Sequence, residues 1–141
     1  IRVHLPAMTV AYSNRDLDVL KKTIWLEARG EPHEGQVAVA HVIKNRARVN
    51  RRYFGGNTIA GVSLHPAQFS CWNNTKPENV NPRGEGWEGM DGWVRGVLDG
   101  AVSDPTNGAL YYINPSLCNP SWTKNLRVGV KIANHQFYNE K

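Results

Sequence analysis

Cysteine is scarce in this sequence, so chemistry that depends on clustered cysteines is excluded. The 141 residues contain only two cysteines, Cys71 and Cys118, which stand far apart along the chain. With no second pair and no Cys-x-x-Cys spacing, the chain has neither a zinc knuckle nor a dithiol redox motif. The two cysteines are compatible with one long-range disulfide or with two buried free thiols, and the sequence leaves both open.

Long apolar runs and blocks of like charge are also absent. Charged residues interrupt every apolar stretch before the ~18–20 residues that cross a bilayer, so no transmembrane segment is expected. No signal-peptide pattern precedes the first helix signal, and Met8 is a candidate natural start. Apolar residues make up 40% and charged residues 21%, without repeats, which excludes a disordered chain, a collagen-like chain or a coiled coil. We expect a soluble protein with an N-terminal extension over 1–15 and a single catalytic domain over 16–141.

The net charge is positive, but no segment is densely basic. Seventeen Lys and Arg residues against twelve Asp and Glu residues give a net charge of +5. Such a surface concentrates near anions such as nucleic acid, anionic lipid or an acidic envelope polymer, although the same charge also serves solubility alone. The sequence lacks the aromatic signatures of RNA-binding domains and a helix-turn-helix pattern, so nucleic acid is not the expected partner.

Apolar spacing predicts three helices, over residues 17–28, 34–49 and 86–102. Asn14 and Asp16 supply N-cap chemistry for the first helix. The second helix is apolar nearly all round, which is typical of a buried helix.

Outside these helices, the sequence predicts a long loop and two short strands. Residues 51–81 are rich in Gly, Pro, Asn and Ser and predict a loop long enough to have a function. Residues 109–114 and 128–138 predict two paired strands. The sequence therefore predicts an α+β fold, mainly helical, with a small β-hairpin.

Glu27 is the first residue that packing does not explain. Helical geometry places it on the same face as four apolar residues, Leu17, Leu20, Ile24 and Ala28. A carboxyl group on such a face costs free energy unless it is paired, protonated or turned toward a cleft. Glycosidic cleavage needs a carboxylic acid that stays protonated near neutral pH, so Glu27 is a candidate catalytic acid. The alternative is an internal ion pair with Arg29 or Arg46.

A series of motifs, in a fixed order, resembles a known family. The series begins with Glu-Ala-Arg-Gly-Glu-Pro over 27–32 and Glu-Gly-Gln-Val-Ala-Val-Ala over 34–40. Four further motifs follow: Asn45-Arg46, Gln68-Phe69-Ser70-Cys71-Trp72, Ala109-Leu110-Tyr111-Tyr112 and His135-Gln136-Phe137-Tyr138. Together they extend over about 17–138 and resemble the SleB/CwlJ-type cell wall hydrolases, which include spore-cortex-lytic enzymes and phage endolysins.

This resemblance implies a lysozyme-like fold related to goose-type lysozymes and lytic transglycosylases. It also implies cleavage of the β-1,4 bond between N-acetylmuramic acid and N-acetylglucosamine, with Glu27 at the position of the family's catalytic acid. In a lytic transglycosylase the muramoyl 6-hydroxyl attacks the anomeric carbon, and one carboxyl group serves first as acid and then as base. No obvious second carboxylate lies on an opposing element, which favours this chemistry over inverting hydrolysis. The candidate second carboxylates are Glu31 and Glu34, and Glu85, Glu88 and Asp91 are further ones.

We expect eight residues to contact the glycan strand, because aromatic faces stack on sugars and amides bind acetamido groups. They are Gln36, Gln68, Phe69, Ser70, Trp72, Tyr111, Tyr112 and His135. Phe69 suits the core at least as well, and His135 also fits a structural role. If Tyr111 and Tyr112 lie in a strand, they point to opposite faces, so one belongs to the core and the other to the cleft. No metal or other cofactor is expected, because the histidines lack ligand spacing.

The sequence thus predicts a peptidoglycan lytic transglycosylase that acts as a phage endolysin or a cell-wall remodelling enzyme. The alternatives are a hydrolytic muramidase, an N-acetylmuramoyl-L-alanine amidase, a cysteine peptidase using Cys71 and His135, and a noncatalytic basic wall-binding module. The expected partners are peptidoglycan glycan strands and the anionic cell envelope. We expect a monomer that acts on the bacterial wall from the periplasm or the exterior, after synthesis in the host cytoplasm if a phage encodes it.

Overall fold

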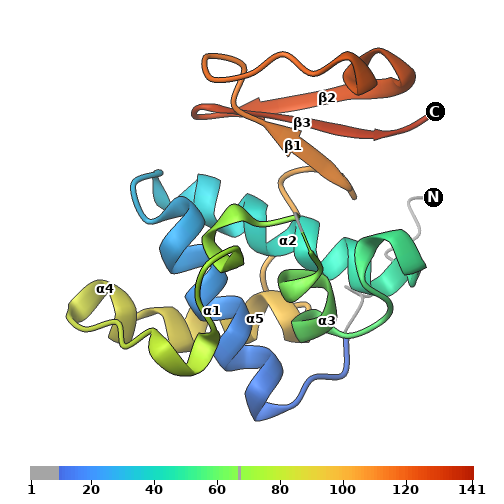
Figure 1. Cartoon of the computed structure of the whole chain (residues 1–141). Coiled ribbons are helices and arrows are strands. Elements are labelled where there is room, and N and C mark those ends of the chain that lie inside the picture. The colour runs from blue at the N-terminus through green and yellow to red at the C-terminus, as the bar shows by residue number, and fades with distance from the viewer. Residues whose placement is uncertain (1–9, 67) are drawn as a thin grey trace, which may run out of the picture.

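The computed structural model describes residues 10–66 and 68–141, which form a helical lobe and a smaller sheet (Figure 1). The helices are α1 (Asn14–Ala28), α2 (His33–Val49), α3 (Ile59–Leu64), α4 (Glu85–Glu88) and α5 (Met90–Asp99). The 3₁₀ turns in the described residues are η1 (Arg52–Phe54), η2 (Ser70–Trp72), η3 (Pro77–Asn79) and η4 (Ser121–Asn125). The strands are β1 (Tyr111–Ile113), β2 (Leu126–Ile132) and β3 (His135–Glu140). The expected α+β, mainly helical architecture is confirmed. None of the helices in the described part is long and apolar enough to cross a bilayer.

The helix α1 begins earlier than predicted, because Ser13 provides the N-cap. The Ser13 hydroxyl accepts the Asp16 N–H (3.0 Å) and the Asp16 carboxylate accepts the Ser13 N–H (2.9 Å), which completes a capping box. Packing begins earlier still, since the Val10 N–H donates to the Leu98 carbonyl (3.1 Å). Residues 1–9 of the predicted extension, including Met8, lie outside the described residues.

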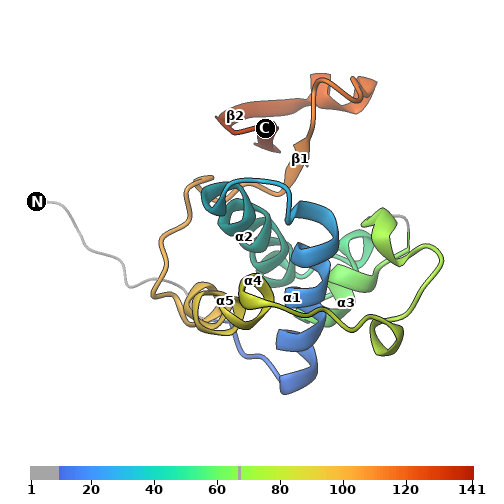
Figure 2. The same ribbon diagram turned by 90° about the vertical axis from the view of Figure 1, so that its left-hand side faces the viewer.

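The helix α2 runs between two apolar clusters, which explains why its sequence is apolar nearly all round. One side, with Val39 and Ile43, packs in the core shared with α1, α3 and α5. The other side, with Ala38 and Val42, packs against Phe137 of the sheet. Figure 2 shows this arrangement, with the sheet on one side of α2 and the other helices on the opposite side.

The sheet is antiparallel in the order β1-β3-β2, and the prediction of one strand over 128–138 is wrong. That segment contributes to two strands, which meet at a turn where Ala133 takes a positive φ of 51°. Alanine rarely adopts this conformation, and no glycine marks the turn in the sequence. The pairing predicted for residues 109–114 does occur, between β1 and β3, where Tyr112 stands opposite Phe137.

Two other predicted segments also differ. The predicted loop over 51–81 contains α3, which Thr58 caps by accepting the Gly61 N–H (2.9 Å) and which buries Ile59 and Val62. This helix is too short for its spacing to stand out. The predicted helix over 86–102 is divided into α4 and α5 at Gly89, and α5 ends where Gly100 takes a φ of 84°.

Candidate active site

A cleft of about 450 Å³ lies between the C-terminal end of α1, the segment around η2 and the sheet. Its walls include two carboxyl groups, a guanidinium group, an imidazole and a phenol. Among the residues that the structure describes, it is lined by Glu27, Glu31, Arg46, Gln68, Phe69, Ser70, Tyr112, Ile113, Asn114, Leu117, Cys118 and His135. Sequence segments that are far apart thus supply a polar, partly charged cavity.

Glu27 lies half-buried in the last turn of α1 and faces this cleft. One of its carboxyl oxygens, Oε1, accepts the Cys71 backbone N–H at 3.1 Å. Within the described chain no Lys, Arg or His side chain forms an ion pair with it. Arg29 instead packs over the Trp25 ring, 5.2 Å from its centroid. The alternative of an internal ion pair with Arg29 or Arg46 is therefore wrong.

Glu31 lies in the turn after α1 and is held at both oxygens. Its Oε1 lies 3.3 Å from His135 Nε2, and its Oε2 accepts the Asn134 side-chain amide at 3.3 Å. The side chains of Glu31 and His135 are only 10% and 9% exposed. Burial lowers the pKa of His135, and the nearby carboxylates of Glu31 and Glu27 oppose that shift. A neutral His135 that donates its Nε2–H to Glu31 is consistent with this geometry.

Arg46 places a buried positive charge in the wall of the cleft. Its Nε donates to the Leu110 carbonyl at 2.7 Å, and its Nη1 donates to Gln68 Oε1 at 3.0 Å. The guanidinium also lies over the rings of Phe54, Phe69 and Tyr111, at 4.7, 5.8 and 5.6 Å from their centroids. Burial lowers the pKa of Arg46. Hydrogen bonds and aromatic faces compensate for its lost hydration.

Tyr112 and Cys71 are both protonated neighbours of Glu27. Burial and the charge of Glu27 raise the pKa of the Tyr112 hydroxyl, whose ring centroid lies 4.8 Å from that of His135. Burial and the contact with Glu27 raise the pKa of the Cys71 thiol to about 12. A thiol in this state is a poor nucleophile, and His135 is engaged with Glu31. The geometry argues against a cysteine peptidase.

The cleft contains five of the eight residues that we expected to contact glycan: Gln68, Phe69, Ser70, Tyr112 and His135. Trp72 lies elsewhere, because its Nε1–H donates to Thr23 Oγ1 (3.0 Å) and its ring packs on the core. Tyr111 points to the other face of β1, between Phe54 and Trp122. Glu34, a candidate second carboxylate, is exposed in the first turn of α2 and does not line the cleft.

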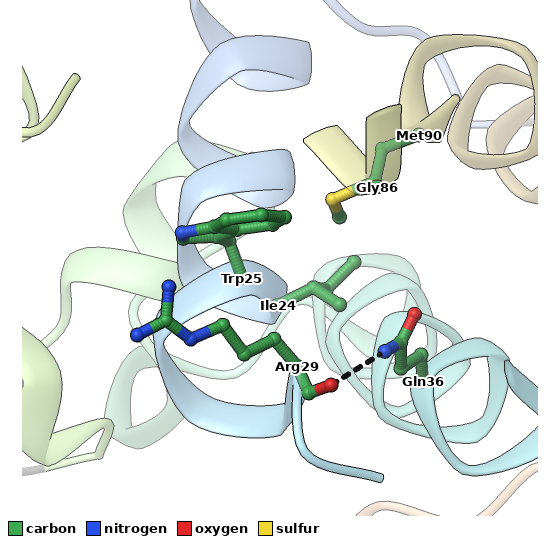
Figure 3. Close-up of a pocket in the computed structure, with 6 residues that line it drawn as sticks. All are labelled: Ile24, Trp25, Arg29, Gln36, Gly86 and Met90. Carbon is green, nitrogen blue, oxygen red and sulfur yellow. Dashed lines mark hydrogen bonds between the residues drawn. The ribbon is translucent and has the colours of Figure 1, made fainter. Parts of the chain in front are cut away.

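Gln36 lies in a second cavity, of about 250 Å³, on a different face of α1 (Figure 3). This cavity is lined by Ile24, Trp25, Arg29, Gln36, Gly86 and Met90. The Gln36 amide donates to the carbonyl oxygens of Arg29 (3.3 Å) and Glu31 (3.2 Å). Gln36 therefore connects the turn after α1 to α2 and makes no contact within the cleft.

Sequence reasoning missed the cleft residues at the end of β1 and in the turn after it. Ile113, Asn114, Leu117 and Cys118 line the cleft because β1 ends there and the chain turns around Asn114, whose side chain accepts the Ser116 N–H (3.0 Å). Cys71 and Cys118 are both unpaired. In the described part of the chain, no group of three or more His, Cys, Asp or Glu side chains is arranged to hold a metal ion.

Known proteins are similar in sequence to this chain. Spore cortex-lytic enzymes of Bacillus subtilis and Oceanobacillus iheyensis are 34% and 35% identical to it over 133 and 114 residues. These alignments include 92% and 79% of this chain but 39% and 37% of the relatives, so the chain spans about two-fifths of their length.

Solved structures share the fold. The catalytic domain of the germination-specific lytic transglycosylase SleB from Bacillus anthracis is 31% identical, with a TM-score of 0.75 over 94% of this chain and 100% of that domain. The catalytic domain of the Bacillus cereus SleB protein is 30% identical, with a TM-score of 0.75 over 96% and 98%. The lysozyme-like fold expected from the sequence is thus confirmed.

A family model described as Cell Wall Hydrolase matches residues 30–138, which include most of the cleft and begin just after Glu27. The match extends over most of the chain and agrees with the relatives and with the fold. This chain belongs to the cell wall hydrolase family.

Proposed function

We propose that this chain cleaves the β-1,4 bond between N-acetylmuramic acid and N-acetylglucosamine in peptidoglycan, with Glu27 as the catalytic acid. The observation that carries the proposal is a half-buried carboxyl group in the cleft wall, anchored at one oxygen by the Cys71 N–H and free of any ion pair in the described chain. The names of the relatives support the substrate, since they are spore cortex-lytic enzymes and a lytic transglycosylase.

The reaction we propose is a transglycosylation. The Glu27 proton moves to the glycosidic oxygen as the bond from that oxygen to the anomeric carbon breaks. The muramoyl 6-hydroxyl oxygen then bonds to the anomeric carbon, and its proton returns to Glu27. The product carries a 1,6-anhydro ring. Because the Cys71 N–H binds Oε1, the other carboxyl oxygen is the one suited to carry the proton.

Glu31 is the second carboxylate of the cleft, and its contacts hold its charge in a fixed position. One of its oxygens lies 3.3 Å from His135 Nε2, and the other accepts the Asn134 side-chain amide at 3.3 Å. We propose that Glu31 stabilises the positive charge that develops at the anomeric carbon, as fixed charges do in active sites.

Gln68 is suited to bind the acetamido group of a sugar. An arginine can only donate hydrogen bonds, so the Gln68 atom that faces Arg46 is the amide oxygen. The amide nitrogen is left to donate to an acetamido carbonyl in the cleft. Ser70 and the Phe69 ring border the same space.

The experiment that tests the assignment is Glu27→Gln, with Glu34→Gln as the matched control. Glu27→Gln keeps the size of the side chain but removes the proton donor, so release of soluble fragments from bacterial sacculi should fall at least about 100-fold. Glu34→Gln removes an exposed carboxylate outside the cleft and should retain full activity. Circular dichroism should show unchanged folding for both. If Glu27→Gln lyses sacculi at the unsubstituted rate, the assignment is wrong.

The biological setting is part of the same proposal. The relatives act, by their names, on the spore cortex, which supports wall lysis as the role of this chain. The phage endolysin origin stays a prediction from the sequence.

A further inference from the structure

Four aromatic rings form a continuous row beside the cleft, across the junction of the helical lobe and the sheet. The ring centroids are 4.6 Å apart for Tyr53 and Phe54, 5.5 Å for Phe54 and Tyr111, and 5.7 Å for Tyr111 and Trp122. We call these four residues the aromatic row. Phe54 is buried in the middle, whereas the two ends are open, since Tyr53 is 54% and Trp122 is 43% exposed.

The aromatic row adjoins the cleft. The Arg46 guanidinium lines the cleft and also lies over the rings of Phe54 and Tyr111. On the other side, the segment that lines the cleft at Leu117 and Cys118 continues directly into η4, which contains Trp122. The aromatic row therefore lies next to residues that bound the cleft, and its exposed ends, Tyr53 and Trp122, are the rings that a ligand can reach.

The exposed rings of the aromatic row are held in place. The Tyr53 hydroxyl accepts a hydrogen bond from Arg51 Nη1 (2.7 Å) and donates one to Glu140 Oε2 (3.2 Å), and Arg51 and Glu140 form an ion pair. Trp122 packs on Tyr111 and approaches Tyr138, with ring centroids 6.5 Å apart. A ring that is already fixed loses little conformational entropy when a ligand stacks on it.

We propose that the aromatic row is a distal sugar-binding subsite, on which the glycan strand stacks after it leaves the cleft. The inference rests on the proposed glycosidase function and extends it, because it assigns a role to Trp122 and Tyr53, which no step of the reaction uses. A glycan strand is the occupant that fits best, because it is a long polymer with apolar ring faces and the row adjoins the cleft where the strand is cut. A strand held there binds more tightly as its length increases.

The test compares the binding of a three-sugar and a six-sugar β-1,4-linked N-acetylglucosamine oligomer, measured by calorimetry in the Glu27→Gln background to prevent cleavage. Trp122→Ala should weaken binding of the long oligomer about tenfold and leave binding of the short one unchanged. Trp122→Phe should keep most of the affinity for the long oligomer, because it retains an aromatic ring. The matched control is Val128→Ala, which removes an apolar side chain that is 65% exposed on β2 and lies outside the aromatic row.

Tyr53→Ala provides a second variant at the other end of the row, in case Trp122→Ala does not fold. It should show the same loss for the long oligomer alone. Unchanged affinity for the long oligomer, or an equal loss for both lengths, overturns the aromatic row as a subsite. So does a dimer in sedimentation that Trp122→Ala dissociates, because a second copy is then the occupant. These outcomes leave the proposed function standing. That function is overturned as well if the unsubstituted protein releases nothing from sacculi and the Glu27→Gln protein binds neither oligomer.

Discussion

The cleft and the second cavity border the same helix, α1, but their walls have opposite chemistry. The cleft side presents Glu27, followed by Glu31 in the next turn, opposite Arg46 and His135. The second cavity is walled mainly by Ile24, Trp25 and Met90. The side chains of Trp25 and Glu27 point to different sides of α1, because two positions along a helix correspond to a rotation of about 200°.

The cleft holds the groups suited to catalysis, whereas the second cavity holds groups that support the structure around them. Figure 3 shows Gln36 at the edge of the second cavity, with its amide bonded to the Arg29 carbonyl, and the same amide also reaches the Glu31 carbonyl. The turn that carries Glu31 into the cleft is therefore held by Gln36 of α2, which lines the second cavity. Substitutions in the second cavity should reduce stability, and substitutions in the cleft should reduce activity.

The largest effect on stability should come from Met90→Ala in the second cavity. Met90 is almost fully buried, and its truncation enlarges a cavity that already exists. The free energy of unfolding should fall by about 3 kcal/mol, measured by urea denaturation. Turnover of sacculi well below the unfolding temperature should stay close to that of the unsubstituted protein. Lost turnover at unchanged stability would contradict the division between the two sides.

Glu31→Gln, in the cleft, should reduce turnover and leave stability nearly unchanged. It keeps the size of the side chain but removes the negative charge, so the rate should fall about 30-fold, which corresponds to ~2 kcal/mol of transition-state stabilisation. The unfolding temperature should fall only slightly, because the amide oxygen can keep the hydrogen bond from His135 and the bond that is lost, from Asn134, is exposed to solvent. Asn134→Ala, which removes one donor to Glu31, should reduce the rate less. Undiminished turnover in Glu31→Gln would mean that Glu31 has only a structural role.

The smallest effect should be a loss of stability in mild acid. Burial lowers the pKa of both His41 and His135 below the ordinary value of 6.5, although Asp104 beside His41 and Glu31 beside His135 oppose the shift. As the pH falls below 6.5, the unfolded chain binds protons that the folded protein does not, so the free energy of unfolding decreases. Urea midpoints at pH 7.5 and pH 5.5 measure this difference.

The matched variant for the acid effect is His41→Gln, which should show a smaller decrease between the two pH values. His41 lies on α2 away from the cleft, so this variant changes the pH dependence of stability and not the chemistry. A midpoint that rises in acid would contradict the assigned pKa shifts.

The sequence correctly predicted side-chain directions where the regular geometry of one helix or strand determines them. Helical spacing placed Glu27 beside Leu20 and Ile24, and the structure confirms that α1 buries both and turns Glu27 to the cleft. Alternation along β1 correctly predicted that Tyr111 and Tyr112 divide between two faces. Both inferences need only the geometry within one element.

The sequence was less informative where the outcome depends on how two elements meet. Gln36 lies outside the cleft because of the path of the turn between α1 and α2, which spacing does not give. Trp72 was expected to contact sugar, but its indole N–H donates a hydrogen bond to Thr23 of α1. The aromatic row likewise joins residues from both lobes and had no local signal.

We propose that this protein cuts glycan by transglycosylation, and the products of the reaction provide the direct test. The purified protein is incubated with sacculi, and the soluble fragments are analysed by mass spectrometry. Transglycosylation should give 1,6-anhydromuramoyl ends, which lack the water that hydrolysis adds. Reducing ends alone would indicate a muramidase, and free stem peptides beside intact glycan would indicate an amidase; either result would rule out transglycosylation.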